Sequence, residues 1–294
     1  MSNSPASEPR SGDSAADRRV TAAGDTTRAA GRTSGRQART LPIASRYPEH
    51  TAAFLSITGG LLLWELLGRY VVQNPLFLAT PLQIAAELMR LLGSGELQVH
   101  IWASGQAFLV GLLLSIVLGI AIGVINAVSP LANRVLNPWV TALYATPTIA
   151  VAPLIILWFG IDLWAKVVVV VINAIFPMII NTETGLRATD RRLLEAVRCF
   201  GANRAQLFFY VMLPSAIPYI LAGVRLSVGR AIVSVVVAEL FGSRAGLGFM
   251  LVQASEIFNM PRLFSAVVVL ALVGIALTAM ARWLEVNLQP WHKS

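Results

Sequence analysis

Residues 195–218 read EAVRCFGANRAQLFFYVMLPSAIP, a polar stretch set between two long apolar runs. Asp190 stands just ahead of it as a helix N-cap, and Gly201 offers a helix stop. Apolar residues before the glycine recur three and four positions apart and therefore share one helical face: Leu193, Ala196, Val197 and Phe200. Pro214 and Pro218 mark where the next membrane helix begins or bends. The pattern predicts a short amphipathic helix outside the bilayer, joined at both ends to membrane spans, whose apolar face docks in a groove of a soluble partner.

The spacing within this stretch resembles the EAA loop of binding-protein-dependent ABC importer permeases. Residues 195–197 stand for Glu-Ala-Ala, with Val in the third place. Gly201 follows at the family's offset, and Leu213-Pro214 closes the pattern. Over residues 100–248 the chain is similar to the nitrate, sulfonate and taurine branch of that family, in segments such as TPTIAVAPLIILWFGID and GVRLSVGRAIVSVVVAELFG.

The resemblance implies an assembly of a second permease copy, two cytoplasmic ATPases and an external solute-binding protein. ATP and Mg²⁺ would be bound by the ATPases, and this chain would hold no cofactor. ATP binding would close the ATPase pair and push on the amphipathic helix, and the spans would turn outward to accept the solute. The residues expected to couple to the ATPases are Leu193, Glu195, Ala196, Val197, Arg198, Phe200, Gly201, Leu213 and Pro214.

Composition independently indicates an integral membrane protein. Of 294 residues, 56% are hydrophobic and only 13% are charged, whereas a soluble domain is about one quarter charged. The net charge of +8 is attributed to membrane orientation and anionic lipid rather than to nucleic acid. A single cysteine, Cys199, excludes an internal disulfide, and the three histidines show no metal-ligand spacing.

The hydropathy pattern predicts an all-α polytopic fold of about six transmembrane helices with a short cytoplasmic coupling helix. Residues 1–50 are predicted to be a disordered, Arg-rich cytoplasmic tail, either passive or regulatory, ahead of a permease domain over 51–294 with its coupling region at 190–218. An interfacial amphipathic helix is expected over 81–92, capped by Thr80. The expected spans are 52–72, 104–128, 135–159 (broken at Pro147 and Pro153), 163–180, 216–241 and 264–283.

Two features of these spans bear on packing and orientation. Gly119 and Gly123 form a GxxxG pair, which serves either packing within one subunit or a contact between subunits. Arginine is concentrated in the tail and in the coupling region, so the positive-inside rule places both termini and the coupling helix in the cytoplasm of a multi-pass inner-membrane protein.

Charges inside the spans need an explanation, because one at the bilayer centre costs about 2.5–3.5 kcal/mol. Arg225 and Arg230 lie in the fifth predicted span, and Glu65 lies in the first. Arg230 either contacts an anionic substrate or forms a structural pair, with Glu65 or Glu239 or with carbonyls near Pro147. Residues that could line a polar pathway are Thr146, Pro147, Thr148, Asn173, Ser227, Arg230, Ser234 and Glu239.

No GxxxxGK[ST] loop, HExxH or GxSxG motif occurs, so the chain is expected to be a transport subunit and not an enzyme. The interpretation is a permease of an ABC importer for a small anionic solute of the sulfonate, taurine, nitrate or bicarbonate class. One alternative is a permease of the same architecture for a pyrimidine precursor of thiamine. The other is an ion-coupled secondary transporter, which would show internal repeats and acid relays.

Overall fold

A computed structural model describes residues 49–72, 74 and 76–288, and the side chains of Glu49, His50, Ala53 and Thr148 fall outside this description. The chain divides into two units, residues 1–52 and 53–294, and the fold below is that of the second. Nearly all of the predicted tail therefore lies outside the described residues. The helices are α1 (Glu49–Leu66), the π-helical η1 (Leu67–Val72), α2 (Pro81–Gly93), α3 (Glu96–Val128), α4 (Pro130–Ala145), α5 (Thr148–Phe159), α6 (Leu163–Arg187), α7 (Arg191–Cys199), α8 (Arg204–Leu207), the π-helical η2 (Phe208–Met212), α9 (Leu213–Phe241), α10 (Leu247–Glu256) and α11 (Met260–Asn287).

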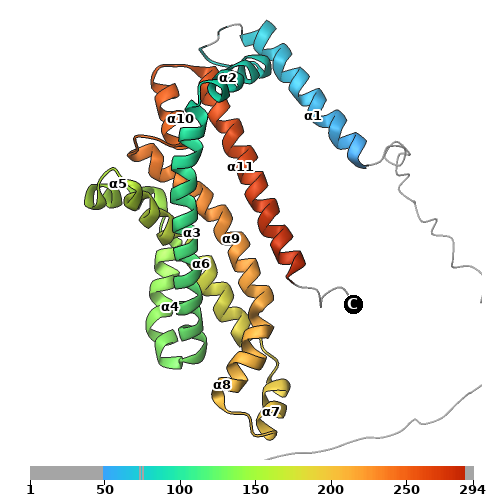
Figure 1. Ribbon diagram of the computed structural model, residues 1–294, viewed down its shortest axis with the longest axis vertical. Helices are drawn as coiled ribbons and strands as arrows, with labels where there is room; N and C mark the ends of the chain where they lie inside the picture. Colours follow the sequence, from blue (N-terminus) through green and yellow to red (C-terminus); the bar gives the residue numbers. More distant parts are fainter. Residues whose placement is uncertain (1–48, 73, 75, 289–294) are drawn as a thin grey trace, which may run out of the picture. The chain divides into compact units, whose positions relative to one another are not determined.

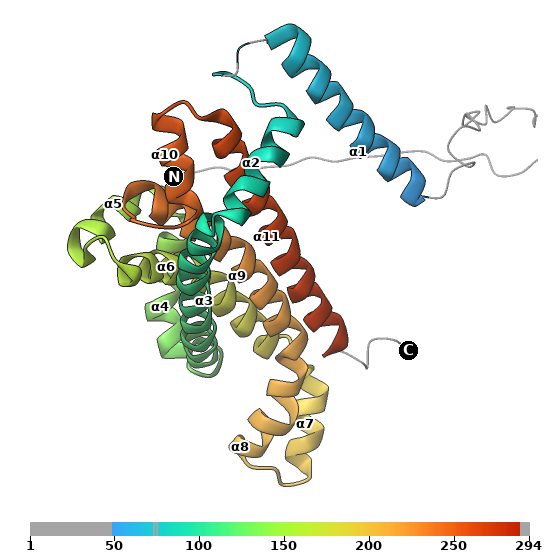
Figure 2. The same ribbon diagram turned by 45° about the horizontal axis from the view of Figure 1, so that its top comes forward.

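Helix α6 is the centre of the bundle and packs along both α3 and α9, while α11 packs on the far side of α9 (Figure 1). At one end of α6 and α9 lie α7 and α8, and at the other lie α2 and α10, as both views show (Figure 2). These are called the α7 end and the α10 end below. The described residues contain helices and no strand, which confirms the predicted all-α class.

Glycines of α3 allow its close approach to α6. A Cβ atom built on Gly123 would lie 2.7 Å from the Cβ of Thr182 and 2.8 Å from the carbonyl oxygen of Ile179. One on Gly119 would overlap the Cβ of Met178 in the same way. The GxxxG pair therefore serves packing within the subunit, the first of its two possible roles.

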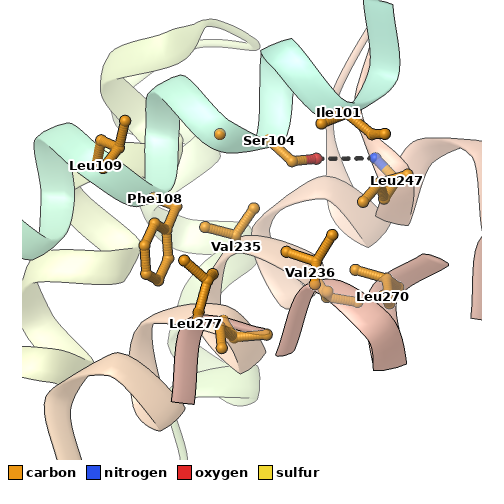
Figure 3. A pocket seen from close by; sticks show the side chains of 12 residues that line it. Ile101, Ser104, Phe108, Leu109, Val235, Val236, Leu247, Leu270 and Leu277 are labelled. Carbon is orange, nitrogen blue, oxygen red and sulfur yellow. Dashed lines mark hydrogen bonds between the residues drawn. The ribbon is translucent and has the colours of Figure 1, made fainter. Parts of the chain in front are cut away.

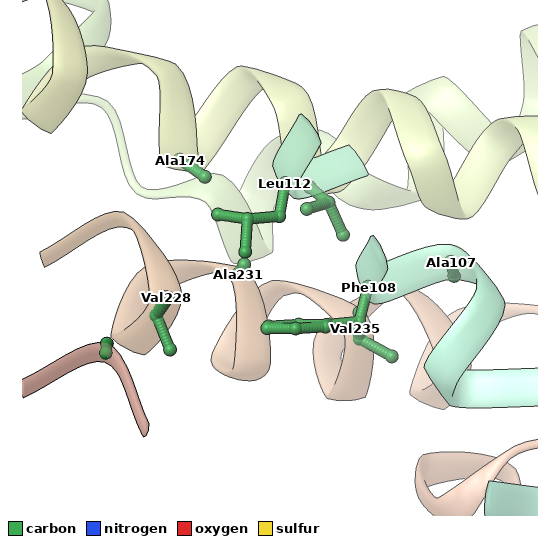
Figure 4. Close-up of a cluster of buried hydrophobic side chains, with 9 residues drawn as sticks. Ala107, Phe108, Leu112, Ala174, Val228, Ala231 and Val235 are labelled. Atoms are coloured by element: carbon green, nitrogen blue, oxygen red, sulfur yellow. The ribbon is translucent and has the colours of Figure 1, made fainter. Parts of the chain in front are cut away.

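Small residues also mark the centre of the bundle. Phe108 and Leu112 of α3 pack against Ala231 and Val235 of α9, beside Ala174 of α6 (Figure 4). Lipid tails are as apolar as these side chains, so their burial gains little from the hydrophobic effect. The stabilisation comes from dense van der Waals contact, which the alanines permit by letting the helix backbones approach.

Five described helices are long and apolar enough to span a membrane, and α4 with α5 makes a sixth if the bent pair is counted as one span. The chain bends by 103° between α4 and α5, and Pro147 at this break is the N-cap of α5. The predicted break at Pro147 is confirmed. The predicted break at Pro153 is wrong, because α5 continues through this residue; a proline removes only one helix hydrogen bond, which membrane helices tolerate.

Local capping confirms that the helix predicted over 81–92 forms. The Thr80 hydroxyl accepts from the Gln83 N–H and the Gln83 side chain accepts from the Thr80 N–H, so α2 begins with a capping box. Several elements differ from the prediction. Helix α3 begins at Glu96, before its expected start at residue 104, and α6 runs past its expected end near residue 180 to Arg187. Helix α10 was not predicted at all.

Candidate functional site

The candidate coupling surface is the pair of short helices α7 and α8 between the α6 and α9 spans. The Asp190 carboxylate accepts from the Arg192 N–H at 2.8 Å and begins α7. At the other end Gly201 has φ of +82°, and its N–H donates to the Arg198 carbonyl at 2.9 Å. The Ala202 N–H donates to the Val197 carbonyl at 3.4 Å, which completes a Schellman motif. The helix predicted here, with its start and stop, is confirmed.

No residue of α7 is buried by the described part of the chain. The Phe200 side chain is 91% exposed and Leu193 is 48% exposed, while Val197 is half-buried. The predicted polar residues Glu195 and Arg198 are exposed beside them. The apolar face of α7 therefore points partly outward, where nothing in the described chain covers it.

A second turn joins this surface firmly to a membrane span. Asn203 and Gln206 form a capping box that begins α8, and helical backbone then continues through η2 into α9. The side chains of Leu207 and Val211 in this segment are buried. Pro214 has no N–H to donate into the helix, and the π-helical turn η2 lies just ahead of it. The candidate coupling surface is therefore joined to α9 by helical backbone without a break.

A polar network fixes the α7 end of α6, and sequence reasoning missed it. The Glu183 carboxylate accepts from Asn133 at 2.6 Å and from Asn126 at 3.3 Å. Arg187 lies 3.1 Å from the same carboxylate and donates to the Asn126 carbonyl at 3.0 Å. These residues are spread over α3, α4 and α6, so only the tertiary fold brings them together.

Arg230 has no carboxylate within ion-pair distance among the residues that the structure describes. Its guanidinium donates to the Tyr144 hydroxyl at 3.0 Å, lies 4.8 Å from the centre of that ring, and reaches the Asn173 side-chain oxygen at 3.4 Å. The predicted pair with Glu65 or Glu239 is wrong. Glu65 instead lies 3.7 Å from Arg69, and Glu239 is bound by Lys166. Glu239 follows Arg230 by nine positions in the same helix α9, which places the two side chains on opposite faces.

The other candidate pathway residues fall into distinct environments. The Asn173 amide donates to the Ser234 hydroxyl at 2.6 Å, which brings both together with Arg230. Ser227 is fully buried and donates to the Ala174 carbonyl at 2.7 Å. Thr146 and Pro147 are exposed at the break between α4 and α5. Arg225 pairs at 3.0 Å with Glu285 of α11, and Glu239 is almost fully buried in a different cluster.

Two cavities lie beside Glu239 at the α10 end, since Ser104 and Lys166, which bind its carboxylate, line one cavity each. An apolar cavity of about 200 Å³ lies between α3, α9, α10 and α11, with Phe108, Val235 and Leu277 on its walls (Figure 3). A polar pocket of about 450 Å³ is lined by Asp162, Lys166 and other residues of α3, α6 and the α9–α10 connection. Within the described ranges no group of three metal-ligating side chains occurs.

The sequence of this chain is similar to that of known transport proteins. Residues 115–292 match the family described as "Binding-protein-dependent transport system inner membrane component". The chain is similar to the "Putative aliphatic sulfonates transport permease protein SsuC" of Bacillus subtilis, with 36% identity over 80% of this chain and 85% of that protein. It is also similar to the "Formylaminopyrimidine transport permease protein ThiX" of Halalkalibacterium halodurans, with 35% identity over 83% and 96%.

A solved structure shows the same fold. A chain of the MetNI methionine ABC transporter in an inward-facing conformation superposes with a TM-score of 0.57 and 21% identity, covering 64% of this chain and 94% of that one. The family match extends over more than half of the chain, and the sulfonate permease confirms the branch indicated by the sequence. The chain therefore belongs to the binding-protein-dependent transport system inner membrane components, the permease subunits of ABC importers.

Proposed function

We propose that two copies of this chain form the translocation pathway of an importer for a small anionic solute. Separate cytoplasmic ATPases bind ATP and Mg²⁺ and drive the importer by their contact with α7. An external binding protein delivers the solute. The observation that carries this proposal is the uncovered apolar face of α7, where Phe200 is 91% exposed. A short amphipathic helix presented in this way suits a groove on a soluble partner.

The coupling residues support this proposal by their placement. Leu193 and Phe200 insert into the ATPase groove, and Glu195 and Arg198 form polar contacts at its rim. Gly201 sets the turn that presents Phe200, and the segment around Leu213-Pro214 passes the motion into α9. A push on α7 then moves α9 as a rigid body.

Orientation follows from the same assignment. The α7 end is in the cytoplasm with both termini, and the α10 end faces the binding protein. Arginines near α7 support this, since Arg191, Arg192 and Arg198 are all exposed there.

A second copy covers the face that bears Arg230. A guanidinium facing lipid is costly, and such groups face protein or a water-filled path. The apolar groove between α4, α5 and α6, about 420 Å³ and lined by Trp139 and Leu143, lies on the side of Tyr144 and supports a protein contact there. The pathway then runs along Arg230, Asn173 and Thr146 between the two copies.

The solute class rests on Arg230. A half-buried guanidinium that is held by a hydroxyl and an amide, with no carboxylate of the described residues to neutralise it, suits a passing sulfonate, nitrate or bicarbonate. The two relatives are named for aliphatic sulfonates and for formylaminopyrimidine, so a pyrimidine solute is the second candidate. The family assignment favours both over an ion-coupled secondary transporter.

Two experiments test the proposal. Purified chain should retain an ABC ATPase from its own genome, and the Phe200→Ala variant should lose it; retention by both would contradict the coupling role. Deletion of the gene should abolish growth on one anionic sulfur or nitrogen source. Loss of growth only when the pyrimidine is supplied in place of thiamine would select the second candidate.

A further inference from the structure

A buried cluster at the α10 end is not used by the proposed pathway. Its centre is the Glu239 carboxylate of α9, which is 1% exposed. Lys166 of α6 donates to this carboxylate at 3.2 Å, and the Ser104 hydroxyl of α3 lies 2.9 Å from both of its oxygens. With His100 of α3, these residues are called the Glu239 cluster.

The Glu239 cluster begins helix α10. Gly246, the N-cap residue, supplies no side chain, so the first N–H groups of the helix need partners from elsewhere. The Gly246 N–H donates to His100 Nδ1 at 3.1 Å, and the Leu247 N–H donates to the Ser104 hydroxyl at 2.8 Å (Figure 3). The Gly248 N–H donates to Glu239 at 2.9 Å. Side chains of α3 and α9 therefore replace the usual local cap.

Lys166 and the two glycines complete this arrangement. The Lys166 ammonium also donates to the Ala245 carbonyl at 2.8 Å, so α6 holds the connection that leads into α10. A Cβ atom on Gly248 would lie 2.8 Å from the Cβ of Glu239, and one on Gly246 would overlap the carboxylate. Residues 246 and 248 must therefore be glycine, because the Glu239 side chain leaves no room for a Cβ atom at the start of α10.

We infer that Glu239 is a positioning residue for transport, which fastens α10 to α9 so that the two helices move as one body. If α10 moved alone, the N–H groups of Gly246, Leu247 and Gly248 would lose His100, Ser104 and Glu239 as their acceptors, which is unfavourable in a buried site. The helix from Arg204 to Phe241 is continuous over 38 residues, about 57 Å. Displacement of the coupling surface therefore reaches α10 through a single helix.

The position of α10 matters because its first residue lines the apolar cavity and the connection that leads into it lines the polar pocket. Leu247 forms part of the wall of the apolar cavity (Figure 3), and Ala245 with Lys166 lines the polar pocket. A shift of α10 with α9 changes both at once. The role in transport rests on the proposed function, whereas the attachment of α10 to α9 does not.

The experiment compares Glu239→Met, Lys166→Met and the double variant in the full chain. Met has a length similar to Glu and no oxygen to accept from the Gly248 N–H. Cys199 is replaced by Ser in every variant, so that cysteines can later be introduced for labelling. Removing one charge leaves the other buried and unpaired, whereas removing both is far better tolerated. We expect each single variant to lower membrane abundance and the double variant to recover it. Uptake by the double variant, reconstituted with its ATPase, should stay at least about tenfold low while ATP hydrolysis continues, because α10 no longer follows α9. Normal uptake by the double variant would overturn the inference.

A second readout does not depend on the ATPase. Spin labels are attached to cysteines that replace Val233 of α9, which is 58% exposed, and the exposed Ser255 of α10. The two labels report the distance between these helices. The double variant should broaden this distance distribution, and Ser104→Ala should broaden it less. Glu285→Gln breaks another ion pair of α9 without touching α10 and should leave it unchanged. An unaltered distribution in the double variant would overturn the inference, whereas failure of the wild type to bind any ATPase would overturn only the proposed function.

Discussion

The contact between α3 and α6 offers a sharp test through Gly123→Ala. This change adds one methyl group where a Cβ would lie 2.7 Å from the Thr182 Cβ and 2.8 Å from the Ile179 carbonyl oxygen. Neither atom is the end of a flexible side chain. The two helices must therefore move apart to admit the methyl group, and the packing along the glycine line loosens.

A matched control lies in the same helix. A methyl group on Gly105 would meet no atom of the described residues within 4 Å, so Gly105→Ala only replaces a helical glycine by alanine. That replacement stabilises a helix by about 0.5–1 kcal/mol, and both variants share this gain. The difference between them isolates the overpacking cost, about 1–3 kcal/mol.

The measurement is the apparent melting temperature in detergent, followed by tryptophan fluorescence. At about 2–4 °C per kcal/mol, Gly123→Ala should melt about 2–12 °C below Gly105→Ala. Gly105→Ala should melt at or above the wild type. Equal melting temperatures for the two variants would refute the close packing of α3 on α6. The GxxxG pair would then serve the alternative role, a contact between subunits.

Three further predictions concern the coupling surface and the pathway. Gly201→Asp places a charged side chain at φ +82°, at a local cost of about 1–2 kcal/mol. This variant should stay in the membrane but lose ATP-driven uptake, with its ATPase activity uncoupled from transport. Normal uptake would count against the coupling role. Phe200→Ala should weaken ATPase binding by about 30-fold in a titration yet leave the melting temperature within about 2 °C, because the ring is 91% exposed; a large loss of stability would show instead that the ring packs within the chain. Arg230→Met should raise the KM for an anionic solute about 10- to 100-fold with ATPase binding intact, and an unchanged KM would assign Arg230 a structural role.

Local sequence was sufficient for the elements whose ends are made by their own residues. Asp190 and Gly201 begin and end α7, and Thr80 with Gln83 begins α2, through contacts no more than a few residues apart. The long apolar runs likewise place the spans, because a span must satisfy its backbone internally and present apolar side chains along its length.

The same reasoning failed where partners come from distant parts of the chain. Helix α10 has no local cap, and its N–H groups are satisfied by His100 and Ser104, which lie more than 140 positions earlier. The expected pair of Arg230 with Glu239 fails for a different reason, because both residues belong to α9. Nine positions along one helix separate them by about 13 Å and place them on opposite faces.

The sequence by itself determined that the chain is a helical membrane protein with a short amphipathic helix between two spans, because hydrophobic length and capping are properties of contiguous residues. Only the tertiary structure decided which buried charges meet and how α10 is held. Those contacts join α3, α6, α9 and α10 across long stretches of chain, and no spacing in the sequence records the rotation and depth at which helices pack.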